Sequence, residues 1–223
     1  MKKFAIGLIL TIVFSNSYGV VLSPTTLEYN IDKKNSEKII ITNNSTEKLA
    51  IEVNVYKLKF NTDGKLYDRQ YDNESLMVFP PAVLLDSGDK QAFRLQWLGT
   101  KELSQSESYF VRFSQINLTS PNRSNPELYP SINFQVHYNT LVHIYSGAQK
   151  PNVTLYVNNN GSARMENNGN RFIYSKNLVF DTPNNIFDKE EPELEEHFIP
   201  PYSNIILANP VNVPMGSYYG NEN

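Results

Sequence analysis

The longest alternation of apolar and polar residues in this chain runs through residues 131–145. One face of that stretch is apolar and the other polar: Ile132, Phe134, Val136 and Tyr138 alternate with Asn133, Gln135, His137 and Asn139. A period of two predicts a half-buried β-strand. The stretch has no Pro or Gly and exceeds the usual length of about five or six residues. We therefore expect a strand that offers its apolar row to another chain.

The first half of the chain contains further short segments with strand-like patterns. They lie at residues 20–29, 39–41, 49–60, 76–79, 83–85, 91–98 and 109–116. Turn signals such as Asp63-Gly64 and Asp86-Ser87-Gly88 separate them. No convincing amphipathic helix appears among them. This spacing predicts an antiparallel sandwich of immunoglobulin-like type.

A second, shorter set of strands is expected after residue 147. Residues 153–157 and 172–180 have strand-like composition, and Asn-Gly pairs punctuate them. The acidic run 188–196 is interpreted as a solvated loop, and the polar, Gly-rich tail from Pro214 is expected to fray. The predicted fold is all-β, with immunoglobulin-like β-sandwich domains at 20–147 and 148–223. The second domain is short, and whether it is complete stays open.

Residues 1–19 have the pattern of a secretory signal peptide. Two lysines precede an apolar run at residues 4–14, and Ser17 and Gly19 are small residues at the positions that a signal peptidase reads. The apolar run is too short for a transmembrane helix. We expect cleavage after Gly19 and an exported protein without membrane insertion; a retained N-terminal anchor is the alternative.

The composition excludes several classes of function. The formal net charge is −3, whereas nucleic-acid-binding proteins normally carry a basic patch. The absence of cysteine excludes disulfides, zinc–thiolate sites and cysteine nucleophiles. The 14 Tyr and 12 Phe favour strands and an apolar core.

Catalytic and cofactor motifs are also missing. The chain has no Gly-Xaa-Ser-Xaa-Gly elbow, phosphate-binding Gly loop or dinucleotide fingerprint. Glu195, Glu196 and His197 raise the question of a metal site, but they lack a ligand spacing fixed by a helix, and a solvated loop is the preferred interpretation. We predict a protein that is not an enzyme and uses no metal or cofactor.

The order of four segments is similar to a known family. A signal peptide precedes Pro-Pro-Ala-Val-Leu-Leu-Asp-Ser-Gly-Asp-Lys-Gln-Ala-Phe-Arg-Leu (80–95), Glu-Ser-Tyr-Phe-Val-Arg-Phe (107–113) and the alternating strand 132–143. Across most of residues 20–160 the chain resembles the PapD-like periplasmic chaperones of chaperone–usher pili. Gln-Trp-Leu-Gly (96–99) and Leu-Val-His (141–143) resemble the alpha-type or archaic branches. The resemblance implies two immunoglobulin-like domains in a boomerang arrangement.

The resemblance also implies donor-strand complementation, in which the chaperone lends a strand to an unfinished pilus subunit. The donor row would be Ile132, Phe134, Val136 and Tyr138. Its partners would be a pilus or fimbrial subunit, bound one-to-one in the periplasm, and an outer-membrane usher, without ATP. The free chaperone is expected to cover its strand by self-association or with the loop 117–130. The alternative to this donor role is an ordinary sandwich strand whose apolar face packs in the core of its own domain.

The family's grip on the subunit's C-terminal carboxylate is harder to transfer. Its members use an Arg in the first strand and a Lys late in the donor strand. These positions fall near Thr26 and between Thr140 and His143, where no Lys is present. His143 or Arg94 are the candidate anchors. The alternatives are that Arg94 is an internal strand residue paired within the chaperone itself and that His143 is a sheet-edge or hinge residue.

Two other classes of function remain open. One is a structural pilus subunit or surface adhesin with immunoglobulin-like domains. Such subunits usually have one domain, often a disulfide, and an alternating donor segment at their own N-terminus, which this chain lacks. The other is a secreted enzyme or ligand-binding β-protein, which the missing catalytic motifs disfavour.

Overall fold

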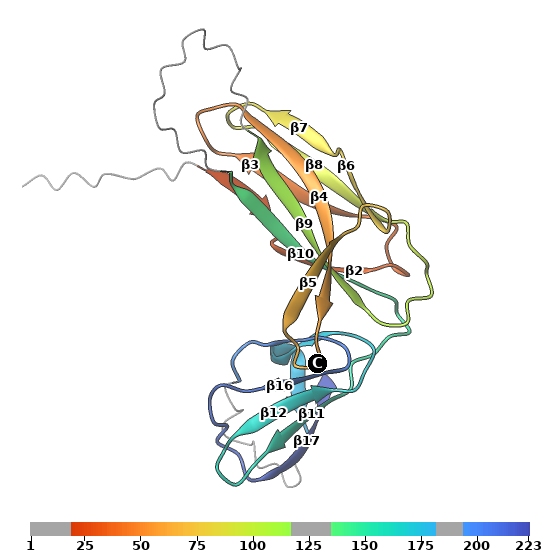
Figure 1. Cartoon of the computed structure of the whole chain (residues 1–223), viewed down its shortest axis with the longest axis vertical. Helices are drawn as coiled ribbons and strands as arrows, with labels where there is room; N and C mark the ends of the chain where they lie inside the picture. Colours follow the sequence, from red (N-terminus) through yellow and green to blue (C-terminus); the bar gives the residue numbers. More distant parts are fainter. Residues whose placement is uncertain (1–18, 117–134, 182–193) are drawn as a thin grey trace, which may run out of the picture.

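The computed structural model describes residues 19–116, 135–181 and 194–223. In this part of the chain no α-helix forms, and the helical element present is the 3-10 turn η1 (Ser175–Asn177). Figure 1 shows the strands in two groups placed end to end. The buried residues from Tyr29 to Ile144 form one hydrophobic core, and those from Val153 to Tyr218 form a second. The expected all-β fold with two sandwich units is confirmed.

Two sheets make up the first unit. Sheet 1 has the order β1-β3-β8-β6, and sheet 2 has the order β2-β10-β9-β4-β5, with β7 paired to the start of β4. All these pairings are antiparallel except that of β2 with β10. The bounds are β1 (Val20–Ser23), β2 (Thr26–Asn30), β3 (Glu37–Asn43), β4 (Leu49–Phe60), β5 (Leu66–Tyr71), β6 (Leu76–Phe79), β7 (Ala82–Leu85), β8 (Lys90–Trp97), β9 (Glu107–Ile116) and β10 (His137–Tyr145).

Alternating side chains from both sheets fill the space between them. In β4 the odd-numbered Ile51, Val53 and Val55 are buried, while the side chains between them face outward. Phe93 of sheet 1 and Phe113 of sheet 2 meet edge to face, with their ring centroids 5.0 Å apart. Such T-shaped pairs add to the stabilisation from burial. The period-two pattern of the sequence therefore selects the faces that meet in the core.

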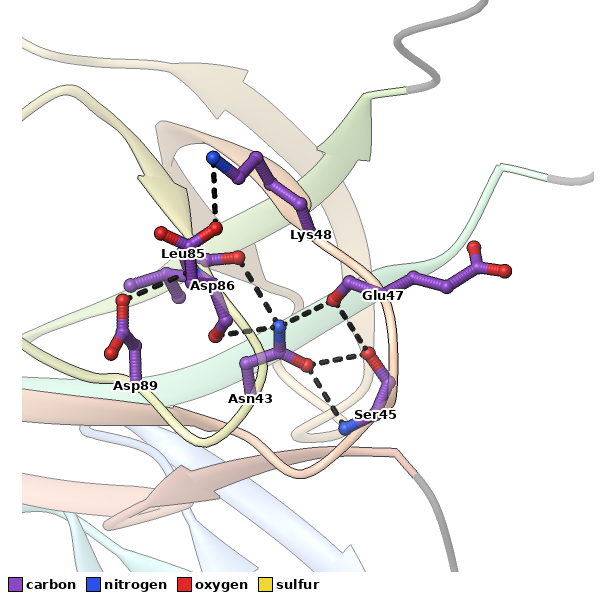
Figure 2. A network of polar contacts seen from close by, with 7 residues as sticks. All are labelled: Asn43, Ser45, Glu47, Lys48, Leu85, Asp86 and Asp89. Carbon is purple, nitrogen blue, oxygen red and sulfur yellow. Dashed lines mark hydrogen bonds and ion pairs between the residues drawn. The ribbon is translucent and has the colours of Figure 1, made fainter.

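A buried asparagine fastens the turns at one end of this unit (Figure 2). Asn43, the last residue of β3, is fully buried, and its amide nitrogen donates to the carbonyls of Glu47 (2.8 Å), Leu85 (3.2 Å) and Asp86 (3.0 Å). Its Oδ1 accepts bonds from the backbone N–H and the hydroxyl of Ser45, at 3.0 and 2.6 Å. One side chain thus ties the β3–β4 turn to the end of β7.

The second unit is smaller. Its main sheet has the order β14-β17-β11-β12-β16, and β13 and β15 form a separate two-stranded sheet. The bounds are β11 (Val153–Val157), β12 (Ala163–Asn167), β13 (Ile173–Tyr174), β14 (Leu178–Phe180), β15 (Phe198–Ile199), β16 (Ser203–Ile206) and β17 (Gly216–Glu222). Leu155 and Met165 are fully buried at its centre, and Ile199 from β15 joins the same core.

The single strand expected at residues 172–180 is wrong. The turn η1 divides this stretch into β13 and β14, which pair with β15 and β17 in different sheets. A local alternation pattern does not show that two halves of a segment have different partners.

The expectation that the tail from Pro214 frays is also wrong. Residues Gly216–Glu222 form β17, which lies between β11 and β14. Tyr218 is buried in the core, whereas Tyr219 is exposed, so the strand alternates despite its polar composition. A Cβ on Gly220 would lie 3.0 Å from the Phe180 ring, so the glycine permits close packing there. Tertiary pairing overrides the weak local signal.

The β4–β5 hairpin reaches from the first unit to the second. The N–H of Asn204 donates to the Thr62 carbonyl (2.7 Å), and the Phe60 and Phe198 rings lie 5.3 Å apart. Gly64, at a φ of 72°, closes the hairpin and approaches Ile205, whose Cγ1 would be 2.9 Å from an added Cβ. Side chains and backbone groups far apart in the sequence therefore join the two units.

Candidate functional site

Within the described residues, strand β10 has an open backbone edge at its N-terminal end. It pairs with β9 from His137 to Ile144, but β2 lies along its other side only from Leu141 onward. The N–H of Gln115 donates to the Val136 carbonyl (3.0 Å), so the backbone groups of even-numbered residues point toward β9. The backbone groups of His137 and Asn139 consequently point to the opposite side, where β2 is not yet present. No described strand pairs with this edge, so its backbone groups are candidates for pairing with an added strand.

The side chains on one face of β10 become steadily more exposed toward that open end. Ile144, Val142 and Thr140 are fully buried, Tyr138 is half-buried against the first core, and Val136 is 41% exposed. The apolar row therefore starts inside the first unit and leaves it. A strand that served only the core of its own unit would bury the row throughout.

Two of the four predicted donor residues belong to the described part of the chain. Ile132 and Phe134 lie outside the described residues, as does the beginning of the strand expected at 131–145. Tyr138 belongs to β10, and Val136 directly precedes this strand, which in the described residues begins at His137 and not before. Tyr138 packs against the first core, so Val136 is the described member of the row with free surface.

His143 lies deep in the junction between the two units. Its Nδ1 is 2.8 Å from the Ser108 hydroxyl, and its Nε2 is 2.8 Å from the Tyr174 hydroxyl. Phe172 and Phe198 of the second unit stack on its ring, with centroids 4.2 and 4.7 Å away. Burial lowers the pKa of His143 to about 3, because removing the ring from water disfavours the charged form.

This environment does not suit a carboxylate anchor. The imidazole is neutral near physiological pH, and both nitrogens already have partners. A carboxylate would find neither a positive charge nor a free donor there unless the junction opened. His143 instead joins the two units, in line with the alternative that it is a hinge residue.

Arg94 lies in the wrong sheet for an anchor beside β10. It belongs to β8 of sheet 1, is exposed, and lies between Lys38 and Phe79 in the strand register. β10 belongs to sheet 2, so the core of the first unit separates the two. Arg94 forms no ion pair with another described residue, so the alternative that it is paired within the chaperone is not seen in this part of the chain either.

The positions of the family's two basic residues carry no charge here. Thr26 is exposed at the start of β2, and Leu141 lies beside it on β10. The Thr140 hydroxyl is used internally, since it donates to the Pro24 carbonyl (3.0 Å). Glu28, two residues along β2, has a pKa raised mainly by burial. The side chains at these positions on β2 and β10 are therefore neutral or acidic, and the nearby positive charges are Arg171 and Lys176 of the second unit, which partly offset the rise in the pKa of Glu28.

Two further kinds of site are absent from the described ranges. These ranges contain no group of three or more His, Cys, Asp or Glu side chains placed to hold a metal ion. They also contain no helix of the length and apolar character needed to cross a bilayer.

The sequence reasoning missed the aromatic junction around His143. Phe172 directly precedes β13, Tyr174 belongs to β13 and Phe198 to β15. All three are far from β10 in the sequence. Nothing in the local alternation marks them as partners of a histidine. The high content of Tyr and Phe in the whole chain was the only signal in the sequence.

Two immunoglobulin-like sandwiches joined at an aromatic junction, with an open-edged strand in the first, define a two-domain all-β protein. Residues 19–133, more than half of the 223 residues, match the family model described as pili and flagellar-assembly chaperone, PapD N-terminal domain. The chain belongs to this family of pilus-assembly chaperones. The resemblance seen in the sequence is thereby confirmed, and the family is periplasmic and not a class of enzymes.

Solved structures agree on the fold. A chain from a chaperone–tip adhesin complex of CFA/I fimbriae is 19% identical, with a TM-score of 0.58, and the match covers 88% of this chain and 91% of that one. The CsuC–CsuE complex of Acinetobacter baumannii gives 15% identity, a TM-score of 0.53 and coverage of 86% and 90%. The periplasmic chaperone SfaE gives 13%, 0.52, and 90% and 91%. A comparison with curated protein sequences gives no match.

Proposed function

We propose that this protein is exported to the periplasm, holds one pilus subunit folded by lending it the strand that leads into β10, and passes the subunit to an outer-membrane usher. The observation that carries this proposal is the open edge of β10 together with the apolar row that leaves the core at Val136. Similar solved structures include chaperones in complex with a tip adhesin or with a pilin, which supports a subunit as the partner.

Backbone and side chains would have separate tasks in this binding. The free N–H and C=O groups of His137 and Asn139 would pair with a strand of the subunit and set its register. Ile132, Phe134 and Val136 would enter the groove that the subunit's missing strand leaves open, with Tyr138 at the margin. Full burial of each large apolar side chain contributes about 1.5–3 kcal/mol. A row of such residues thus provides binding energy without a cofactor.

Release would follow from exchange of one strand for another. The next subunit's own extension would replace the chaperone's strand at the usher, so that subunit surface is never left exposed to water. An exposed strand edge is also an aggregation hazard for the free chaperone. We expect the free protein to cover it by self-association or with residues 117–130.

Co-expression in the periplasm with the pilus subunit encoded beside this gene tests the proposal. The variants are Phe134→Asp and Val136→Asp, and the matched control is Val179→Asp, because Val179 is similarly exposed (46%) but lies on β14 of the second unit. We expect wild type and Val179→Asp to be recovered in one-to-one complexes. Phe134→Asp and Val136→Asp should fold and lose the subunit, because an aspartate in an apolar groove is an unpaired buried charge.

Other results would contradict the proposal in identifiable ways. If the two donor-row variants do not fold, those residues belong to the protein's own core. If every variant, including wild type, folds without retaining a subunit, the chain does not act as a chaperone for that subunit. A polymer of the chain alone would favour a structural pilus subunit.

A further inference from the structure

The outer face of sheet 2 carries an arginine–aromatic cluster, formed by Tyr56, Arg69, Tyr71, Phe110 and Arg112. Tyr56 of β4 is the register partner of Phe110 on β9 and of Tyr71 on β5. The Arg112 guanidinium carbon lies 4.8 Å from the centre of the Tyr56 ring, and that of Arg69 lies 5.4 Å from the centre of the Phe110 ring. Two cations are therefore held on adjacent aromatic rings.

Neither guanidinium has an acidic partner within the described ranges. No ion pair there includes Arg69 or Arg112, and the hydrogen bond of Arg112 goes to the neutral Asn139 Oδ1 (3.1 Å). Lysines on the same hairpin behave differently, since Lys57 pairs with Glu107 and Lys59 with Asp68. The overall charge of the chain is −3, so the cluster is a local positive site on an acidic protein.

The cluster lies next to the part of sheet 2 that the second unit covers. On the outward face of this sheet, aromatic rings of the second unit stack on His143 of β10, and Leu58 of β4 is buried. Arg112 is the register partner of Asn139, which lies on the open stretch of β10. Arg112 thus lies close to the open edge, whereas Arg69 lies on β5, on the opposite side of sheet 2.

From this placement we infer that the arginine–aromatic cluster binds acidic side chains on the body of the subunit that occupies the β10 edge. The inference rests on the proposed function and adds a second contact to it. Planar guanidinium groups bind carboxylates through paired hydrogen bonds, and stacking on an aromatic ring holds them in place for this. The cluster would select subunits by their charge, whereas the apolar row selects them by shape.

Distance excludes the added strand itself as the source of the carboxylate for Arg69. Neighbouring strands lie about 4.8 Å apart, and β5 is separated from β10 by β9 and β4, so Arg69 starts about 14 Å from β10 across the sheet. A strand added to the far side of β10 is one spacing further away. The group that reaches Arg69 must come from a part of the subunit that lies over the face of sheet 2.

The test uses the full chain co-expressed with the adjacent pilus subunit. The variants are Arg69→Gln, Arg112→Gln and the double variant. The matched control is Arg164→Gln, which also removes a guanidinium stacked on a tyrosine, since Arg164 lies 4.3 Å from the centre of the Tyr156 ring in the second unit. Dissociation of the purified complexes is followed by exchange with differently tagged wild-type chaperone, at low and high NaCl.

We expect each single variant to dissociate about tenfold faster than wild type at low salt, as for loss of a charge-assisted contact, and the double variant faster still. High salt should shrink the difference, and Arg164→Gln should behave as wild type. Changing an acidic residue of the subunit to lysine should restore slow dissociation when combined with Arg112→Glu.

Three outcomes separate the ways of failing. If the wild-type complex forms and the arginine variants dissociate like Arg164→Gln, this inference is overturned while the proposed function stands. If no complex forms with wild type, the proposed function itself fails. If blocking the subunit's C-terminal carboxylate abolishes the effect and no side-chain change does, the cluster binds the chain terminus and the side-chain assignment is wrong.

Discussion

Replacing His143 by phenylalanine should change how the stability of the protein depends on pH. Phenylalanine keeps an aromatic ring packed against Phe172 and Phe198, but it cannot bond to the Ser108 or Tyr174 hydroxyls, which lie 2.8 Å from the two imidazole nitrogens. Each lost hydrogen bond to a buried group costs about 1 kcal/mol. Near pH 7.5 we expect the free energy of unfolding of His143→Phe to be about 2 kcal/mol below that of wild type.

In acid, His143→Phe should become more stable than wild type. The pKa of His143 is about 3 in the folded protein, against 6.5 for a free side chain. Between these two values the unfolded chain binds a proton that the folded protein does not, so stability is fully present above pH 6.5 and falls as the pH is lowered. The loss is about 1.4 kcal/mol per pH unit. The variant has no such loss, so the two curves should cross near pH 5, and at pH 4 the variant should be more stable by about 1.4 kcal/mol.

Urea denaturation at a series of pH values measures these differences. Ser108→Ala is the control, because it removes one hydrogen bond but keeps the imidazole, so its stability should fall in acid as steeply as that of wild type. Glu28, whose pKa is raised by burial, is present in every protein compared, so its contribution cancels in the differences. A stability difference between His143→Phe and wild type that stays constant from pH 7.5 to pH 4 would refute the burial of a neutral histidine at the junction.

Three further substitutions test other parts of the structure. Asn43→Ala removes five hydrogen bonds at a fully buried site, so urea denaturation should show a loss of about 3 kcal/mol; a loss no larger than that of Ser87→Ala, which removes one exposed bond, would contradict this. Gly64→Ala combines a φ of 72° with a contact of 2.9 Å to Ile205, so the melting temperature should fall by several degrees, and an unchanged one would show that the hairpin tip is not packed. Val142→Asp, at a fully buried position, should yield no folded protein by circular dichroism, whereas a well-folded variant would mean that this face of β10 is not core.

The sequence predicted the parts of this fold that depend on local alternation. Most strands of the first unit and the turns at Gly64 and Gly88 follow from period-two patterns and from residues that tolerate positive φ, but β5 (Leu66–Tyr71) was not predicted. The pattern failed for β17, because its seven residues are mostly polar and Gly-rich and owe their strand to pairing on both sides. It also failed to divide residues 172–180, since the partners of β13 and β14 are distant in sequence.

The candidate site was predictable to a similar degree. Alternation identified the strand and its apolar row, but it gave no information about where that row leaves the core, which depends on the length of β2 along β10. The burial of His143 could not be predicted from the neighbouring sequence, because its partners Phe172 and Phe198 come from the second unit. The clustering of Arg69 and Arg112 could not be predicted from the sequence, because only the pairing of β4, β5 and β9 brings them onto one face.

The two halves of β10 have opposite environments, and this difference bears on how the strand keeps its register. The half from Leu141 to Ile144 is paired on both sides, and aromatic rings of the second unit pack against His143. A slip of one residue would move every side chain to the other face of the sheet. Such a slip would take Val142 out of the core and His143 out of its hydrogen bonds, so the buried half strongly disfavours it. The same backbone continues into the open half, so the contacts of the buried half also fix the register at Val136. An aromatic junction between the units thus sets the register of the apolar row at a distance from the open edge, which is where the proposed function places a subunit.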